Sequence, residues 1–137
     1  MKKALLFLLL PFFWSCDSGN YNNNNPHIPN YNFTVEINTN LPSYNNLKFA
    51  SNGKYIAEGG ARGIIVFNTG SGYTAFDAAC PNQALSSCST MSVDGINAVC
   101  SCDNAEYSLF TGQSKGKTYP MKPYRVEAND NIIRVYN

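Results

Sequence analysis

Two short segments hold the residues whose types and spacing could do chemistry: Cys80-Pro81-Asn82 and Cys100-Ser101-Cys102-Asp103. Seventeen residues, 83–99, separate Asn82 from Cys100, and a further cysteine, Cys88, lies among them. Thiolates are good ligands for zinc and for the iron of iron–sulfur clusters. In an oxidising compartment, thiols pair instead as disulfides. Four thiols this close in sequence could therefore bind a metal or cross-link the chain.

The N-terminus predicts export from the cytoplasm. Two lysines precede an apolar run over residues 4–14, which is shorter than the roughly 20 apolar residues that a membrane span needs. Ser15-Cys16 follows, and it resembles the cleavage box of bacterial lipoproteins, although Phe13 and Trp14 depart from the usual pattern. We expect a signal peptide over 1–15 and lipidation of Cys16, which would anchor the protein to a membrane of the bacterial cell envelope. An ordinary signal peptide with an incidental cysteine is the alternative.

Residues 16–32 predict a flexible tether. The segment contains a run of four asparagines, Pro26 and Pro29, and it has almost no apolar side chain whose burial could offset the entropy of ordering. His27, the only histidine of the chain, lies in this segment, and we expect it to be a solvent-exposed linker residue rather than a metal ligand. The remaining residues, 33–137, are enough for one domain with a single core.

The charge balance argues against nucleic acid as a partner. Removal of the signal peptide takes away two lysines, so the ten basic residues become eight against nine acidic residues. No basic stripe remains that could follow a phosphate backbone. Lys115, Lys117 and Lys122 lie near one another in a turn-rich stretch, where we expect solvated charges.

Residues 33–137 predict an all-β domain. Residues 33–37 alternate apolar and polar side chains, and residues 63–67 form a β-branched run suited to a central strand. Further strands are expected at 73–77, 124–127 and 132–136, the last two joined by a turn at Asn129-Asp130-Asn131. No stretch shows a helical stripe. The spacing of strands and turns is typical of an antiparallel sandwich or small barrel.

The two cysteine segments resemble the Rieske motif, in which Cys-x-His is followed by Cys-x-x-His. In that motif two cysteines hold one iron and two histidines hold the other. The resemblance covers most of residues 33–137 and implies a Rieske-like fold with a cysteine-loop subdomain. Beyond the cysteines, the resemblance rests on the lead-in to the first segment, residues 58–67 and Ala75-Phe76. It also rests on the residues after the second segment: Tyr107, Leu109 and the turn Thr111-Gly112, the proline-containing loop Tyr119-Pro120-Met121 and the closing strand 124–127.

Both histidine positions of the motif are substituted. Asn82 and Asp103 stand where the histidines would be, and Cys80 and Cys100 stand at the cysteine positions. An amide oxygen is a weak ligand for such an iron, whereas a carboxylate could serve. We therefore interpret the chain as a degenerate member with vestigial cluster positions, and we expect no metal and no standard two-iron two-sulfur cluster. If a cluster binds, Cys80 and Cys100 with Asp103 are the expected ligands.

The four cysteines after Cys16 predict two disulfides, because the protein is expected to be exported and the number is even. Three pairings are possible from the sequence alone. The resemblance favours Cys80–Cys100 with Cys88–Cys102, because the former ligands of one iron lie close together in that scaffold. A zinc site is less favoured, since Cys100 and Cys102 are one residue too close for a Cys-x-x-Cys knuckle. Free thiols are a further alternative.

Catalysis is not expected. The carboxylates near the cysteines have no spacing that defines an acid–base pair, and the serines there lack a positioned base. No phosphate-binding loop is present. We expect a non-enzymatic, membrane-anchored Rieske-like domain that acts as a binding or structural module of the cell envelope, with an envelope protein or ligand as partner. The alternative is an electron-transfer lipoprotein whose iron–sulfur cluster has atypical ligands. A thiol redox protein in which Cys100 and Cys102 cycle is disfavoured, because no helix N-terminus is expected there to lower a thiol pKa.

Overall fold

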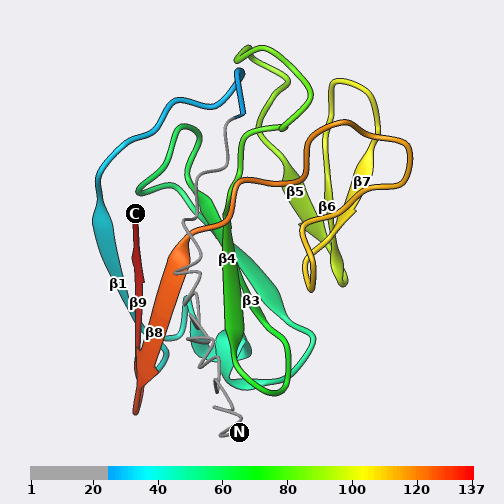
Figure 1. The fold of residues 1–137 in the computed structure, drawn as a ribbon. Coiled ribbons are helices and arrows are strands. Elements are labelled where there is room, and N and C mark those ends of the chain that lie inside the picture. The colour runs from blue at the N-terminus through cyan, green and yellow to red at the C-terminus, as the bar shows by residue number, and fades with distance from the viewer. Residues whose placement is uncertain (1–24) are drawn as a thin grey trace, which may run out of the picture.

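The computed structural model describes residues 25–137 and shows three antiparallel sheets of three strands each (Figure 1). The predicted signal peptide, the lipidation site Cys16 and the first part of the predicted tether lie outside the described residues. Within the described part, no helix is both long and apolar enough to cross a membrane.

The first sheet has the strand order β1-β9-β8, the second β2-β3-β4 and the third β5-β6-β7. The strands of the first sheet are β1 (Thr34–Asn38), β8 (Arg125–Asn129) and β9 (Ile132–Tyr136). Those of the second are β2 (Gly53–Ile56), β3 (Ile64–Asn68) and β4 (Tyr73–Asp77). The third sheet contains β5 (Ser92–Asp94), β6 (Asn97–Val99) and β7 (Glu106–Ser108). A 3-10 helix, η1, covers Asn45–Lys48.

Strand β3 lies at the centre of the molecule, with both of its faces buried. Ile64 and Val66 pack into a core shared with the first sheet, while Ile65 and Phe67 pack into a second core that contains the third sheet and two of the cysteines. Side chains alternate across a strand, so one strand can serve two cores. This double burial explains why its sequence is a continuous apolar run rather than an alternating one.

The all-β fold is confirmed, and the five predicted strands are present as β1, β3, β4, β8 and β9. The turn between β8 and β9 is also present, with Asp130 in the left-handed region at a φ of 52°. Strands β2, β5, β6 and β7 were not predicted. They are only three or four residues long, which is too short for an alternating pattern to stand out.

The buried carboxylate of Asp77 connects the second sheet to its neighbours. One oxygen accepts hydrogen bonds of 2.6 Å from the Tyr124 hydroxyl and from the Ala61 backbone N–H. The other oxygen accepts a 2.7 Å bond from the backbone N–H of Ala79, at the start of the cysteine-bearing loop. Burial, together with the Asp77 charge, raises the pKa of the Tyr124 hydroxyl, which therefore stays protonated and donates.

Residues 25–32 differ from the expected tether because they lie against the domain. Ile28 is buried, and the buried Asn25 side chain donates a 2.8 Å hydrogen bond to the Pro81 carbonyl. The His27 ring meets the Tyr119 ring edge-on, with centroids 6.0 Å apart, so this histidine is not a freely exposed linker residue. Lys122, expected to be solvated, is also buried, and its ammonium donates to the Asn30 side chain at 3.0 Å. One apolar side chain and a few paired polar groups suffice to dock this part of the segment.

Candidate functional site

Two loops at one end of the third sheet carry the cysteines. The first loop, residues 78–91, connects β4 to β5, and the second, residues 100–105, connects β6 to β7. Backbone hydrogen bonds shape the first loop, from Cys80 N–H to the Ser89 carbonyl at 2.8 Å and from Met91 N–H to the Ala78 carbonyl at 2.7 Å. The second loop is a tight turn in which Asn104 adopts a φ of 58°. The cysteines are thus held in place by backbone geometry.

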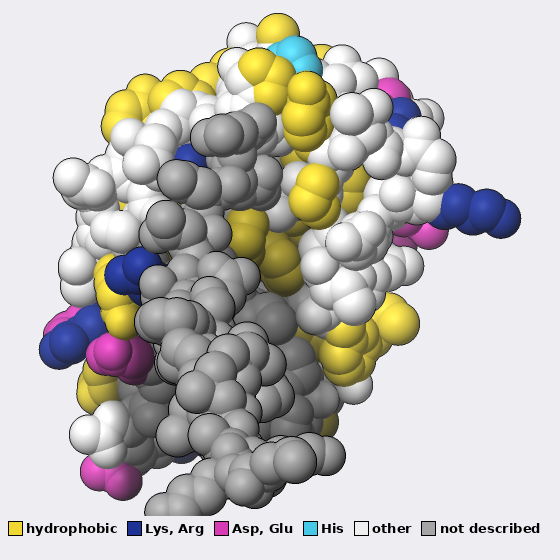
Figure 2. Space-filling view, viewed as in Figure 1, with side chains coloured by type: hydrophobic (Ala, Val, Ile, Leu, Met, Phe, Trp, Pro, Cys, Tyr) yellow, Lys and Arg dark blue, Asp and Glu magenta, His cyan; other side chains and the backbone are white. Residues whose placement is uncertain are grey.

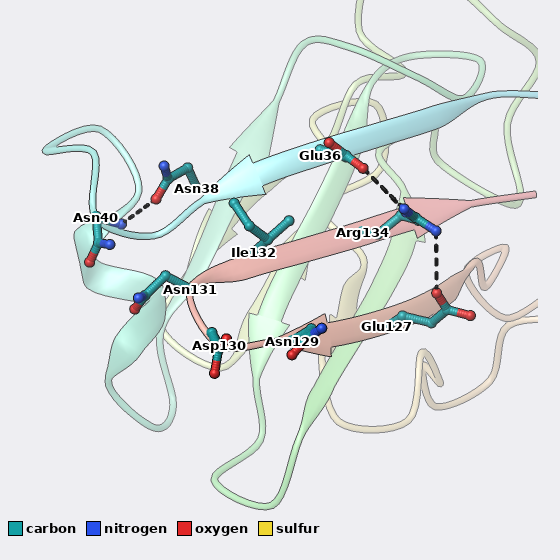
Figure 3. Close-up of a pocket in the computed structure, with 9 residues that line it drawn as sticks. All are labelled: Glu36, Asn38, Asn40, Glu127, Asn129, Asp130, Asn131, Ile132 and Arg134. Atoms are coloured by element: carbon teal, nitrogen blue, oxygen red, sulfur yellow. Dashed lines mark hydrogen bonds and ion pairs between the residues drawn. The ribbon is translucent and has the colours of Figure 1, made fainter.

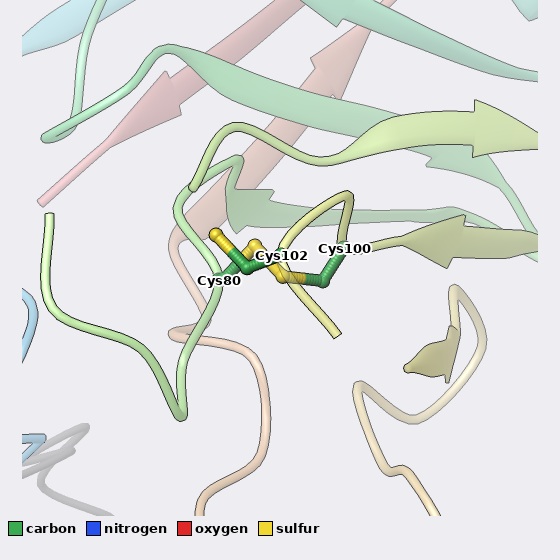
Figure 4. A group of neighbouring side chains, drawn as sticks. All are labelled: Cys80, Cys100 and Cys102. Atoms are coloured by element: carbon green, nitrogen blue, oxygen red, sulfur yellow. A yellow bond between two sulfur atoms is a disulfide. The ribbon is translucent and has the colours of Figure 1, made fainter. Parts of the chain in front are cut away.

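The structure joins the four cysteines as Cys80–Cys100 and Cys88–Cys102, the pairing that the resemblance favours. The Cα atoms are 5.6 Å apart in the first bridge and 5.1 Å apart in the second. Cys80 and Cys100 are fully buried, whereas Cys88 is exposed and Cys102 is half-buried. The two bridges lie side by side, because the sulfurs of Cys80, Cys100 and Cys102 are within 4.8 Å of one another (Figure 4).

Asn82 holds the third loop of the site, residues 113–120, against the first. Its amide nitrogen donates to the Tyr119 carbonyl at 2.8 Å and to the Tyr107 hydroxyl at 2.9 Å. Its amide oxygen accepts a 2.9 Å hydrogen bond from the Tyr119 backbone N–H. Tyr107 is fully buried, and this burial raises the pKa of its hydroxyl. The Asn82 side chain, at the first histidine position, therefore uses both its amide nitrogen and its amide oxygen in hydrogen bonds to Tyr107 and Tyr119.

Asp103 occupies the second histidine position and is also paired. Its carboxylate lies 2.9 Å from the Lys117 ammonium and accepts a 3.0 Å hydrogen bond from the Gln83 side chain. The backbone N–H of Ala105 donates to it at 3.0 Å as well. The hydrogen bond from Lys117 lowers the pKa of this carboxyl, so Asp103 is ionised at neutral pH. One carboxylate thus links all three loops.

The structure brings the four cysteines together as expected, but it turns Asn82 and Asp103 toward the third loop. Sequence reasoning missed Gln83. Lys117 is exposed, as expected of a solvated charge, but its pairing with Asp103 was not predicted. A single polar pair across 14 residues leaves no periodic signal in the sequence. The only available signal was the opposite charge of Lys117 and Asp103.

This arrangement does not fit a two-iron two-sulfur cluster. Such a cluster requires two free thiolates on one iron and two further strong donors on the other. Here Cys80 and Cys100 are bonded to each other, and the Asn82 amide bonds to Tyr119 and Tyr107. A cluster would require the Cys80–Cys100 bridge to be reduced. It would also require these contacts, or the pairing of Asp103 with Lys117, to break.

The outer surface offers a second feature, a polar groove of about 600 Å³ on the first sheet, away from the cysteines (Figure 3). Arg134 on β9 lies between two carboxylates there, 3.2 Å from Glu36 on β1 and 3.7 Å from Glu127 on β8. These exposed pairs run across the three strands and contribute little to stability. On the face shown in Figure 2, charged side chains are scattered rather than gathered in one patch.

Comparison with solved structures identifies the fold. A chain from the complex of reduced oxygenase and oxidized ferredoxin in carbazole 1,9a-dioxygenase superposes with a TM-score of 0.51 at 17% identity, over 75% of this chain and 92% of that chain. Sphingomonas yanoikuyae B1 ferredoxin gives a TM-score of 0.47 at 16% identity, over 65% and 88% of the two chains. The ferredoxin of carbazole 1,9a-dioxygenase from Nocardioides aromaticivorans IC177 gives 0.45 at 13% identity, over 66% and 90%.

The first of these likenesses shows that the fold is Rieske-like, so the fold predicted from the cysteine segments is confirmed. No protein-family model matches the sequence, and no curated protein matches it.

Proposed function

We propose that this Rieske-like chain is a membrane-anchored protein of the cell envelope whose cysteine loops are a cross-linked scaffold rather than an iron–sulfur centre. In this function the domain is a non-enzymatic binding or structural module. The observation that carries the proposal is the state of the four vestigial cluster positions. Cys80 and Cys100 are joined to each other, and Asn82 and Asp103 are bonded to the third loop.

The scaffold interpretation is supported by the two disulfides, which supply the cross-link that a cluster would supply in this fold. A cluster would tie the two cysteine loops together, and here two disulfides do so. Closing a loop of 20 residues by a disulfide stabilises a fold by about 3 kcal/mol in the chain-entropy treatment. Asn82 and Asp103 add the third loop to this unit. The loops are therefore held without a metal.

A rigid loop cluster is also a suitable place for binding a partner, because loops positioned by a stable scaffold commonly carry binding residues. The anchoring step would be lipidation of Cys16, with residues 17–24 between the lipid and the docked segment. An envelope protein or ligand is the proposed partner. Nucleic acid is not the proposed partner, because the sequence carries no basic stripe that could follow a phosphate backbone.

The proposal is tested by reducing the full chain, adding iron and sulfide under anaerobic conditions, and measuring iron, acid-labile sulfide and visible absorption. We expect a colourless protein without stoichiometric iron, and non-reducing mass spectrometry of the protein before reduction should show four paired cysteines. The double variant Asn82→His/Asp103→His, reduced and treated in the same way, shows whether restoring the two histidine ligands is enough for a cluster to form. Stoichiometric iron and sulfide in the parent chain would overturn the proposal in favour of an electron-transfer lipoprotein with atypical ligands.

A further inference from the structure

The two disulfides differ in access but lie side by side. Cys80 and Cys100 are both fully buried, so an external thiol has no direct path to their sulfurs. Cys88 is exposed and forms the outer end of the neighbouring bridge. Disulfide exchange requires a thiolate to reach a sulfur, so access decides which bridge reacts first. By this criterion the outer bridge, Cys88–Cys102, reacts before the inner bridge, Cys80–Cys100.

Cys102 belongs to the outer bridge and also touches the inner one. Its sulfur lies within 4.8 Å of the sulfurs of both Cys80 and Cys100 (Figure 4). A rotation of its own side chain, once it is free, would bring it onto the inner bridge. Ser86 stands beside the outer bridge, with its hydroxyl oxygen 3.3 Å from the Cys88 sulfur and 3.9 Å from the Cys102 sulfur. A hydroxyl there can donate to either sulfur as a thiolate forms.

We propose that the two bridges form a disulfide relay, in which the outer bridge accepts electrons from an external dithiol and Cys102 passes them to the inner bridge. This activity goes beyond the scaffold role proposed above and does not depend on it. The external reductant is a dithiol, either a small molecule or a protein with two neighbouring thiols. The buried Cys80 and Cys100 thiols are the end product.

The relay balances as a series of thiol–disulfide exchanges. A thiolate of the dithiol attacks the Cys88 sulfur, the Cys88–Cys102 bond breaks, and Cys102 leaves as a thiolate. The second thiol of the reductant closes its own disulfide and releases Cys88. Cys102 then attacks Cys80 or Cys100, forming a new disulfide and releasing the other buried thiol.

Cys88 next attacks Cys102, which restores the outer bridge and frees the second buried thiol. The net result is oxidation of one dithiol and reduction of Cys80–Cys100, with transfer of two electrons and two protons. The outer bridge is unchanged at the end and therefore acts as the carrier.

The test uses two matched variants of the full chain, Cys88→Ser and Cys102→Ser. Both lose the same outer bridge, so both lose the same cross-link, but only Cys88→Ser keeps the thiol that touches the inner bridge. After incubation of each oxidised variant at mildly alkaline pH, acid quenching, alkylation and non-reducing peptide mapping show which cysteines are joined. We expect Cys102 joined to Cys80 or Cys100 in Cys88→Ser, and Cys80–Cys100 retained in Cys102→Ser.

The same pair gives a rate. In dithiothreitol under native conditions, we expect the inner bridge to be reduced about tenfold faster or more in Cys88→Ser than in Cys102→Ser, because without the relay it reacts only through local opening of the fold. Equal rates in the two variants would overturn the relay. So would a Cys88→Ser protein in which Cys102 is fully alkylated and Cys80–Cys100 is intact. Neither result depends on iron, so failure of the relay is distinguishable from failure of the proposed scaffold function.

Discussion

The Asn82 side chain is hydrogen-bonded to both backbone groups of Tyr119, donating to its carbonyl at 2.8 Å and accepting from its N–H at 2.9 Å. An amide has a donor and an acceptor side by side, as a peptide group does, so it can pair with both groups at once. A neutral imidazole carries one donor and one acceptor on separate nitrogens and cannot match this geometry. The residue at the first histidine position is therefore suited to holding a loop.

We expect Asn82→Ala to lower the free energy of unfolding by about 2 kcal/mol, because three partly buried hydrogen-bonding groups lose their partner. Urea denaturation of the oxidised protein measures this change. Asn45→Ala, which removes an exposed amide at the start of η1, is the control and should leave stability nearly unchanged. An Asn82→Ala protein as stable as the parent would show that the amide does not hold the third loop.

Loss of the inner bridge should also destabilise the domain. We expect Cys80→Ala/Cys100→Ala to lower the free energy of unfolding by at most about 3 kcal/mol in the oxidised state, since the unfolded chain regains the part of the freedom of the 20-residue loop that the remaining Cys88–Cys102 bridge does not restrict. Thermal unfolding without reductant checks this. In excess reductant the parent loses the same cross-link, so the two proteins should converge. A difference that persists unchanged after full reduction would mean that packing, rather than the bond, is responsible.

Acid should weaken the link between Asp103 and Lys117. Their hydrogen bond lowers the folded-state pKa of Asp103, so its contribution to stability is full above the unfolded pKa of about 3.9 and is lost as the pH falls through the folded value. We expect Lys117→Met to raise the pKa of Asp103 toward its ordinary value, as measured by NMR titration of the carboxyl carbon. Lys115→Met removes a neighbouring exposed charge and is the control. A pKa of Asp103 that is the same in Lys117→Met as in the parent would contradict the pairing.

The predictable parts of this molecule are those with a signal inside a short window. Strand β3 is marked by a continuous apolar run, and the cysteine segments are marked by their spacing. The partners of Asn82 and Asp103 were not predictable, because Tyr119 and Lys117 lie 37 and 14 residues away in sequence. Nor was the docking of residues 25–32, since one buried isoleucine in a polar segment does not form a pattern.

Lipidation of Cys16 is a prediction about the part of the chain outside the described residues. We expect the exported parent to enter the detergent-rich phase in a Triton X-114 separation and to carry the added mass of acyl chains. Several chains on one residue are needed, because a single chain gives only marginal binding. Cys16→Ser should remain in the aqueous phase, whereas Cys88→Ser, the control for loss of a cysteine, should partition like the parent. An unmodified Cys16 in the mature protein would refute the anchor.

Alanine substitutions at Gly60 and Gly95 test the hydrogen bonds of the buried Asp77 carboxylate, with Gly95 as the control position. Both glycines adopt a left-handed φ, 64° and 58°, so alanine at either position carries the same backbone strain of about 1 kcal/mol. At Gly95 an added Cβ would meet no atom within 4 Å, whereas at Gly60 it would lie 2.5 Å from an oxygen of Asp77. That oxygen accepts the hydrogen bonds from Ala61 and Tyr124.

Gly60→Ala must displace the carboxylate or the turn, and it cannot do so without breaking at least one of these buried bonds. We therefore expect Gly60→Ala to lower the free energy of unfolding by about 2 kcal/mol more than Gly95→Ala does, as measured by urea denaturation. Tyr124→Phe removes one of the same bonds without crowding and should fall between the two. Equal losses in the two glycine variants would mean that the Asp77 carboxylate shifts freely and does not fix the junction between the second sheet and the cysteine loop.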